Sequence, residues 1–198
     1  IQTVDGTVSV SVAASLAQDA AGNSNTASNS LSWSYDGTAP QLLMVSIPSA
    51  DGVYTAGTVF PIRLTYDEAV LISGAIPYVQ VEAGATDRTA QYLSGSGTST
   101  ITFSYTVTAS DVNNDLDLVA GSQLFTNGAV VADALGNVVS TALPIGAATT
   151  GSISNTQNIK VVGTPALLTL SDGPLYDYGA VPNGGSLDYS LTLTNTGG

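Results

Sequence analysis

The sequence predicts an all-β protein built from tandem β-sandwich units, and three observations lead to this fold class. Short runs such as Val8-Ser9-Val10-Ser11-Val12 alternate apolar and polar residues, which is typical of half-buried strands. No window of ten or more residues shows helical periodicity. The turn Asp19-Ala20-Ala21-Gly22-Asn23 also returns 114 residues further along as Asp133-Ala134-Leu135-Gly136-Asn137. That spacing is about the length of one sandwich domain, so the repeat indicates tandem domains.

Residues 1–36 predict the last two strands of a first domain. The alternating runs at 8–12 and 30–35 flank the Asp19 turn, in which Gly and Asn tolerate a positive φ. The Gly and Pro of Asp36-Gly37-Thr38-Ala39-Pro40 then end the pattern, as expected of a linker. Two strands alone are marginally stable, so we expect the remaining strands of this domain to lie outside the sequence.

Residues 37–163 predict one complete Greek-key sandwich of about seven strands. We expect Asp67-Glu68 to close the second strand and Gly95-Ser96-Gly97 to form a hairpin turn. An acidic loop is expected at 111–117. The predicted strands are 42–47, 59–66, 78–81, 89–93, 100–107, 129–132 and a last one near 151–162.

Residues 164–198 predict the opening strands of a third domain. They follow a second linker, Gly163-Thr164-Pro165, and contain strand-like runs at 167–170 and 187–194. A turn at Asp172-Gly173-Pro174 follows the first of these runs. We therefore expect the chain to be a segment of a longer protein, with one complete and two partial domains.

The composition excludes several classes of function. With 15 acidic and 3 cationic residues the net charge is −12, whereas nucleic-acid phosphates and anionic membranes require clustered Lys and Arg. No stretch is apolar enough for a membrane span. The chain contains no Cys and no His, which removes the thiol nucleophile, the commonest general base and the usual zinc ligands. We therefore expect no enzyme activity, and we expect the acidic residues to be solvated or neutralised by a divalent cation.

An ordered series of short motifs resembles the bacterial Ig-like repeats of large secreted adhesins and surface proteins. The resemblance covers about residues 36–162 and implies Ig-like Greek-key sandwiches that act as extracellular stalks and spacers, often with calcium between neighbours. The motifs are Asp36-Gly37-Thr38-Ala39-Pro40, Tyr54-Thr55-Ala56-Gly57, Asp67-Glu68-Ala69-Val70, Tyr92-Leu93-Ser94-Gly95-Ser96-Gly97-Thr98, Phe103-Ser104-Tyr105-Thr106-Val107 and Asp133-Ala134-Leu135-Gly136-Asn137.

The C-terminal segment is similar to a different Ig-like module. Pro165-Ala166-Leu167-Leu168, Tyr176-Asp177-Tyr178-Gly179 and Thr194-Asn195-Thr196-Gly197-Gly198 resemble the start of the bacterial choice-of-anchor domains related to the ASPM, SPD-2 and Hydin family. This resemblance also implies a structural, extracellular role. The partners implied are neighbouring Ig-like domains, with a host or cell-surface glycan or protein as a further possibility.

Five acidic and amide residues are expected to meet at the junction of the first and second domains. In a sandwich the second strand and the last turn return to the pole where the linker enters. That topology brings together Asp36, Asp67, Glu68, Asp133 and Asn137. Ca²⁺ takes six to eight oxygen ligands of these types, so we expect a calcium site that stiffens the linker. The alternative is that Asp133 and Asn137 only cap their own turn and that Asp67 and Glu68 are solvated.

A second, weaker calcium candidate lies in the acidic loop, at the opposite pole. Its residues resemble the start of an EF-hand but lack the Gly and the final Glu of that motif, so a solvated polar turn is an equal alternative. The residues are Asp111, Asn113, Asn114, Asp115 and Asp117.

Other interpretations remain open beside the stalk. Trp33 and the nine Tyr residues are interpreted as core and edge packing. An exposed row of Tyr on one sheet face would favour a glycan-binding or protein-binding module, whereas Tyr rings buried between the sheets would favour a stalk. The incomplete end domains allow an assembly subunit that is completed by strands from another chain. Asp67-Glu68 as a glycosidase pair and Lys160 in an isopeptide bond are less favoured.

Overall fold

The computed structural model describes residues 4–164, 168–170, 183, 185 and 192–195, and it is nearly all β. The predicted all-β class is confirmed. The strands are β1 (Gly6–Val10), β2 (Leu31–Tyr35), β3 (Leu42–Ser46), β4 (Gly52–Tyr54), β5 (Val59–Ser73), β6 (Tyr78–Glu82), β7 (Arg88–Ser94), β8 (Thr98–Thr106), β9 (Val112–Asn113), β10 (Asp117–Leu118), β11 (Val130–Ala132), β12 (Ile159–Val162), β13 (Leu168–Leu170) and β14 (Leu193–Asn195). A single helical turn, α1, spans Ile153–Thr156.

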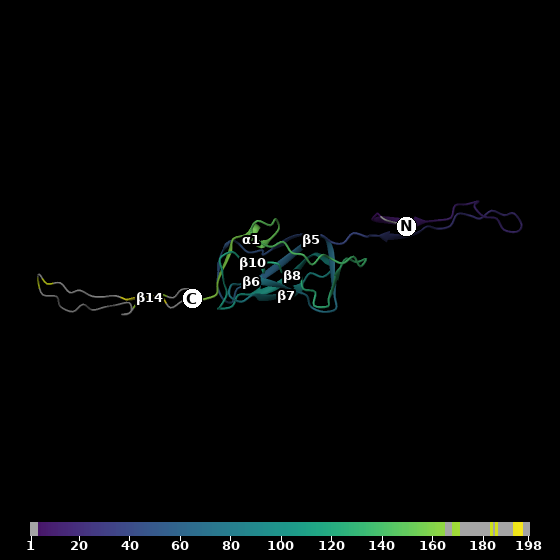
Figure 1. Ribbon diagram of the computed structural model, residues 1–198. Helices are drawn as coiled ribbons and strands as arrows, with labels where there is room; N and C mark the ends of the chain where they lie inside the picture. The colour runs from purple at the N-terminus through teal and green to yellow at the C-terminus, as the bar shows by residue number, and fades with distance from the viewer. Residues whose placement is uncertain (1–3, 165–167, 171–182, 184, 186–191, 196–198) are drawn as a thin grey trace.

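The central body contains two sheets (Figure 1). The larger has seven strands in the order β10-β6-β7-β8-β5-β11, with β3 paired to the first half of β5. Every pair in this sheet is antiparallel. The smaller sheet has the order β4-β12-β9, and its β4–β12 pair is parallel.

Side chains from both sheets share one buried core. Alternate residues of β5 and β8 point inward, so that Ile62 stands opposite Phe103 and both are fully buried. Ile159 and Val161 of β12 are also fully buried and belong to the same cluster. The cluster draws on residues from Val45 to Val161, and this central core anchors the loops that connect its strands.

Two further pairs of strands lie outside this core (Figure 1). β1 and β2 pair antiparallel, with Val8 opposite Trp33, which confirms the two strands expected in residues 1–36. Val10, Leu31 and Trp33 of these two strands are exposed, Trp33 to 48%, whereas Val8 is half-buried. β13 and β14 also pair antiparallel. The turn predicted at 172–174 and most of the strand predicted at 187–194 lie outside the described residues.

The predicted end of the second strand at Asp67-Glu68 is wrong. β5 continues to Ser73 and contains a bulge, because Thr65 pairs with Thr100 whereas Val70 pairs with Thr98. The two carboxylates sit in this bulge, where the backbone N–H of Asp67 donates to the carbonyl of Gln41. A bulge changes the direction of the side chains that it contains. Here the Glu68 side chain lies near the carboxylates of Asp36 and Asp133.

The last predicted strand, near 151–162, is also shorter than expected. Gly151 has a φ of +86°, and the Ser152 side chain accepts a hydrogen bond from the N–H of Asn155. These features start α1, so that β12 begins only at Ile159. The Gln157 side chain accepts a hydrogen bond from the N–H of Ile47 and donates one to the carbonyl of the same residue. Ile47 directly follows β3, so this side chain takes the place of a neighbouring strand at the end of β3.

Among the described residues, no helix is long and apolar enough to cross a membrane. The single helical turn, α1, has four residues.

The hairpin turn at Gly95 gives a stability test of the β7–β8 register. Gly95 has a φ of +109°, and a Cβ there would lie 2.1 Å from the carbonyl oxygen of Thr100. Gly95→Ala should therefore lower the free energy of unfolding by about 3 kcal/mol or more, through clash and backbone strain together. Gly128 also has a positive φ but open space around its Cβ position, so Gly128→Ala should cost only about 1 kcal/mol. Equal losses in urea unfolding would contradict the close approach of the two strands at Gly95.

Candidate metal centre at the linker junction

The Asp133 turn is fixed by hydrogen bonds to its own carboxylate. One oxygen, Oδ1, accepts the N–H groups of Leu135 (2.8 Å) and Asn137 (2.9 Å). The other, Oδ2, accepts the Asn137 amide at 2.7 Å. Gly136 supplies the positive φ, +94°, that the turn needs. The predicted turn is confirmed, and its geometry leaves the buried Asp133 carboxylate with a fixed orientation.

The first copy of the motif folds in the same way. Asp19 Oδ1 accepts the N–H groups of Ala21 and Asn23, and Oδ2 accepts the Asn23 amide, all at 2.9 Å. The flanking bridges also correspond, since Gln18 pairs with Ser24 and Ala132 with Val138. The five-residue motif therefore encodes this carboxylate geometry locally, whether the turn is exposed or buried.

Asn137 links the turn to the incoming linker. Its side-chain amide donates to the carbonyl of Asp36 at 3.0 Å as well as to Asp133. This contact joins residues 101 positions apart in the sequence. Asp36 is consequently held beside Asp133 at the end of the central body.

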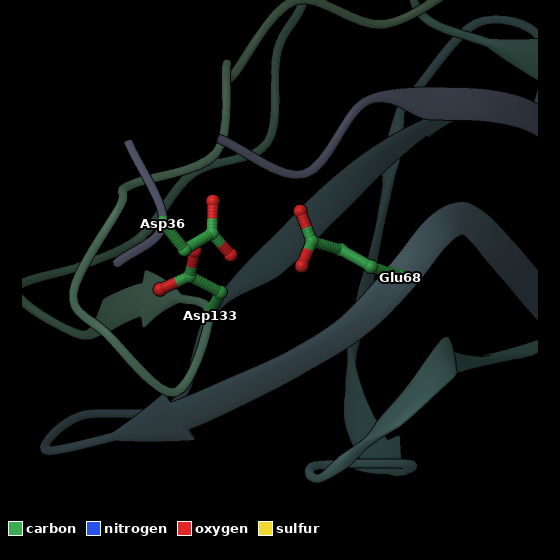
Figure 2. Close-up of side chains that lie close together, drawn as sticks. All are labelled: Asp36, Glu68 and Asp133. Carbon is green, nitrogen blue, oxygen red and sulfur yellow. The ribbon is translucent and has the colours of Figure 1, made fainter. Parts of the chain in front are cut away.

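Glu68 completes a cluster of three carboxylates. One oxygen from each of Asp36, Glu68 and Asp133 lies within 4.8 Å of the other two. Figure 2 shows the three side chains pointing toward one another, with Glu68 reaching across from the β5 bulge. Among the described residues this is the one group of three acidic side chains with such spacing.

The cluster has no cationic partner in the described part of the chain, whose one salt bridge joins Arg88 to Asp111. Burial raises the pKa of Glu68, and the charges of Asp36, Asp133, Asp67 and Asp5 raise it further. Burial raises the pKa of Asp133, but the hydrogen bonds from Asn137, Leu135 and Gly136 together outweigh it and the pKa is lowered overall. Burial and the acidic neighbours thus both disfavour the ionised form of Glu68.

The other members of the predicted set have structural partners. The Asp67 carboxylate accepts the N–H of Gln41 at 2.8 Å, so it lies beside the start of β3 rather than in the three-residue cluster. Asn137 lies at the junction, where its amide nitrogen binds Asp36 and Asp133. Sequence analysis missed Asp5, whose carboxylate accepts the N–H of Gly37 and the hydroxyl of Thr38. No motif marks Asp5, since it acts through the β1–β2 pairing that brings it to the linker.

A shallow hollow of about 490 Å³ opens beside the cluster. The β1–β2 pair, the linker and the central body all contribute to its walls, through Asp5, Tyr35, Asp36, Thr38, Glu68 and Leu135 among others. Hydrated cations therefore have a route to the carboxylates from solvent. The oxygen-rich donor set fits a hard divalent ion such as Ca²⁺, with water completing the shell.

The second predicted site is organised differently, around the fully buried Asp111. Its carboxylate binds the Arg88 guanidinium at 2.7 Å, the Tyr105 hydroxyl at 2.7 Å and the N–H of Thr108 at 2.8 Å. Burial raises the pKa of Asp111, but the hydrogen bonds from Thr108, Tyr105 and Arg88 outweigh it and the pKa is lowered. The carbonyl of Asp111 also accepts the N–H of Gly163, which attaches the exit linker to this loop.

The structure does not gather the remaining loop residues around Asp111. Asn113 donates to the carbonyl of Glu82, and its side-chain oxygen accepts the N–H of Asp115. Asp117 is buried and accepts from the N–H of Gly146 and the hydroxyl of Ser154. Asp115 and Asn114 are exposed. These contacts serve local turns and the packing of α1.

Comparisons of this chain with protein-family models, curated proteins and solved structures find no match.

The raised pKa of Glu68 gives a pH test. An ionised carboxylate whose folded-state pKa is raised destabilises the fold above that pKa, and the penalty disappears as the pH falls below its ordinary value of 4.5. In EDTA at pH 7, Glu68→Gln should therefore raise the melting temperature, and its advantage over the parent should shrink toward pH 4. Glu82→Gln is the matched control, since Glu82 is the chain's only other Glu. A melting temperature that Glu68→Gln leaves unchanged or lowers at pH 7 would show that the repulsion is relieved by other means.

Neutralising Asp111 should lower stability, whereas neutralising Glu68 should raise it. Asp111→Asn would turn an amide donor toward Arg88, Tyr105 or Thr108 and leave the guanidinium without its counter-charge. Breaking a buried pair in this way should cost about 3 kcal/mol or more. Urea unfolding measures the loss, with the exposed Asp87→Asn as control. A loss no greater than the control's would mean that this network adds little to stability.

Proposed function

We propose that the chain is a stalk segment of a bacterial cell-surface or secreted adhesin-like protein, made of tandem Ig-like Greek-key β-sandwiches. Residues 37–163 form the complete domain of this proposal, 1–36 belong to a preceding domain and 164–198 to a following one. The domains act as spacers, and Ca²⁺ bound at the junctions stiffens the rod. No catalysis is included, since the sequence lacks His and Cys.

The observation that carries the proposal is the convergence of Asp36, Glu68 and Asp133 without a cation. They come from a linker, a strand bulge and a turn. Three anions held together in this way repel one another, and a divalent ion would replace that repulsion with attraction. Because Asp36 belongs to the linker, an ion that binds it together with the other two would also fix the angle between neighbouring units.

The repeated turn supports the tandem arrangement. The Asp19 and Asp133 turns share their hydrogen-bond pattern and flanking register. This likeness is expected of equivalent positions in successive domains. The entering linker is held at one end of the central body through Asn137, and the exit linker is bound to the Asp111 loop. Separate entry and exit attachments suit a chain of domains in series.

The tyrosines also favour a stalk over an aromatic binding platform. None of the six Tyr residues in the described part of the chain is exposed. Tyr66 and Tyr105 are buried in the core, and the hydroxyls of Tyr54 and Tyr92 bond to nearby backbone. These rings stabilise the fold, with Tyr54 packed edge-on against Phe60.

Calcium dependence of thermal unfolding tests this proposal. With a dissociation constant of about 10⁻⁴–10⁻³ M, as for extracellular modules, Ca²⁺ at ten to a hundred times that value should add about 1.4–2.7 kcal/mol by mass action. The melting temperature should then rise by several degrees relative to EDTA. Mg²⁺ at the same concentration should give a smaller rise, because it demands a stricter octahedral shell.

Variants decide whether the gain comes from the junction. Glu68→Gln and Asp133→Ala should lose the calcium-induced shift, whereas Glu82→Gln should keep it. Asp133→Ala also removes the turn's hydrogen bonds, so each variant is compared with itself in Ca²⁺ and in EDTA. Identical melting curves with and without calcium in the parent would leave these carboxylates as turn and surface residues.

A further inference from the structure

The outward face of the large sheet differs chemically from the rest of this acidic chain. It is formed by β3, the first half of β5, β8, β7 and β6, whose alternate residues point away from the core. At these outward positions Glu82, at the end of β6, is the one carboxylate, in a chain with 15 acidic residues. The acidic residues therefore leave this face largely free.

Uncharged polar groups and the cation Arg63 occupy it instead, together with exposed apolar side chains such as Val59 and Leu93. The register aligns Ser104 of β8 with Gln91 of β7, and Gln91 with Tyr78 of β6, in one row across the strands. Tyr78 stacks on Phe125 at the end of this row, with the ring centroids 4.8 Å apart. Hydroxyl and amide groups of β8 and β7 thus stand side by side next to an aromatic pair.

A shallow groove of about 510 Å³ runs between β7 and β8 on this face. Gln91 and Thr89 are exposed, and Ser104 is half-buried. The polar side chains that line the groove are Arg88, Thr89, Gln91, Ser104, Thr106 and Thr108. Its volume falls within the range of small-molecule sites.

Arg88 is held rigidly at one end of the groove. Its Nε binds Asp111, and one terminal nitrogen donates to the hydroxyls of Thr108 and Ser110. The Asp111 carboxylate neutralises the guanidinium, so the groove carries almost no net charge, and Arg88 is a donor held in a fixed position. Fixed polar groups lose little entropy on binding, which favours a polar ligand.

The charge and polarity of the groove determine which class of ligand it can bind. Nucleic acid is excluded by the net charge of −12, and a lipid would need an apolar lining. A protein interface of standard size buries about 800 Å² per partner around an apolar core, whereas Leu93 is the one exposed large aliphatic side chain among the residues that line this groove. A ligand rich in hydroxyl groups and without charge complements the lining.

We propose that the β7–β8 groove binds a neutral oligosaccharide, with Gln91 and Ser104 as hydrogen-bonding residues and Arg88 as a fixed donor. The inference rests on the groove alone and is independent of the stalk and of calcium. Binding is weak, in the millimolar range, as expected of an open groove with few buried contacts.

The test is a titration of the ¹⁵N-labelled full chain, followed by NMR, with neutral tetrasaccharides. The probes are cellotetraose, maltotetraose, laminaritetraose and tetra-N-acetylchitotetraose, with tetragalacturonate as the anionic comparison. At least one neutral probe should shift the signals of Gln91, Ser104 and Thr106, and tetragalacturonate should bind less tightly.

Paired variants locate the site. The double variant Gln91→Ala/Ser104→Ala should weaken binding about tenfold or more, because two hydrogen-bonding groups are lost. The matched double variant Gln80→Ala/Thr102→Ala removes similar groups from the same face outside the groove, and it should leave the affinity within about twofold.

Each other result overturns the proposal. The groove is not a saccharide site if no neutral probe shifts these signals at millimolar concentration, or if both double variants lose the same affinity. Tighter binding of tetragalacturonate would contradict a neutral ligand. Shifts of the same signals with protein concentration alone would identify the face as an interface between copies of the chain.

Discussion

Repulsion among carboxylates that three separate segments bring together is the constraint on which the linker junction depends. Asp133 is locked by three hydrogen bonds from its own turn. Asn137 binds the carbonyl of Asp36 and so keeps the linker beside that turn. Glu68 comes from a strand anchored in the core. The junction therefore has three ways to relieve the charge: protonate Glu68, take up a cation, or release the linker. Each changes how firmly the linker and the β1–β2 pair before it are held.

At the exit linker, the buried carboxylate of Asp111 is neutralised within the chain itself. Asp111 is as buried as any residue of the core, yet it carries its counter-ion with it in Arg88 and also binds Tyr105 and Thr108. Its backbone carbonyl holds Gly163 of the exit linker, where an added Cβ would lie 2.1 Å from the Thr108 carbonyl. This linker contact is a backbone hydrogen bond beside an ion pair within the chain, so it needs no cation from solution. The two ends of the central body thus differ. At the exit linker, Arg88 neutralises the buried carboxylate, whereas the three carboxylates at the entry linker have no cationic partner in the described part of the chain and are accessible to a cation.

The contrast between these two ends marks what the sequence could predict. Turns and long strands follow from local patterns, so the alternation on β8 and both Asp-Ala-x-Gly-Asn turns were predictable. The β5 bulge was not, because Asp67-Glu68 looks like a strand end and only pairing with Thr98 and Thr100 keeps the strand running. The partner of Asp111 was equally hidden, since Arg88 is 23 residues away and the acidic loop resembles a metal-binding motif. Local chemistry placed the carboxylates, whereas tertiary contacts decided which of them were neutralised.

The exposed Asp19 turn shows how such a junction is assembled. It holds its carboxylate in the same network as Asp133 without the burial that surrounds Asp133. Hydrogen bonds from Asn23, the largest of its influences, lower the pKa of Asp19 as well. The turn thus prepares an ionised, oriented carboxylate before any neighbour arrives. What Asp133 has in addition is a linker carbonyl on Asn137 and a glutamate from a bulge. In the proposed rod, each unit would therefore fold with one ligand already placed, and its cation site would be completed only when the adjoining linker docks.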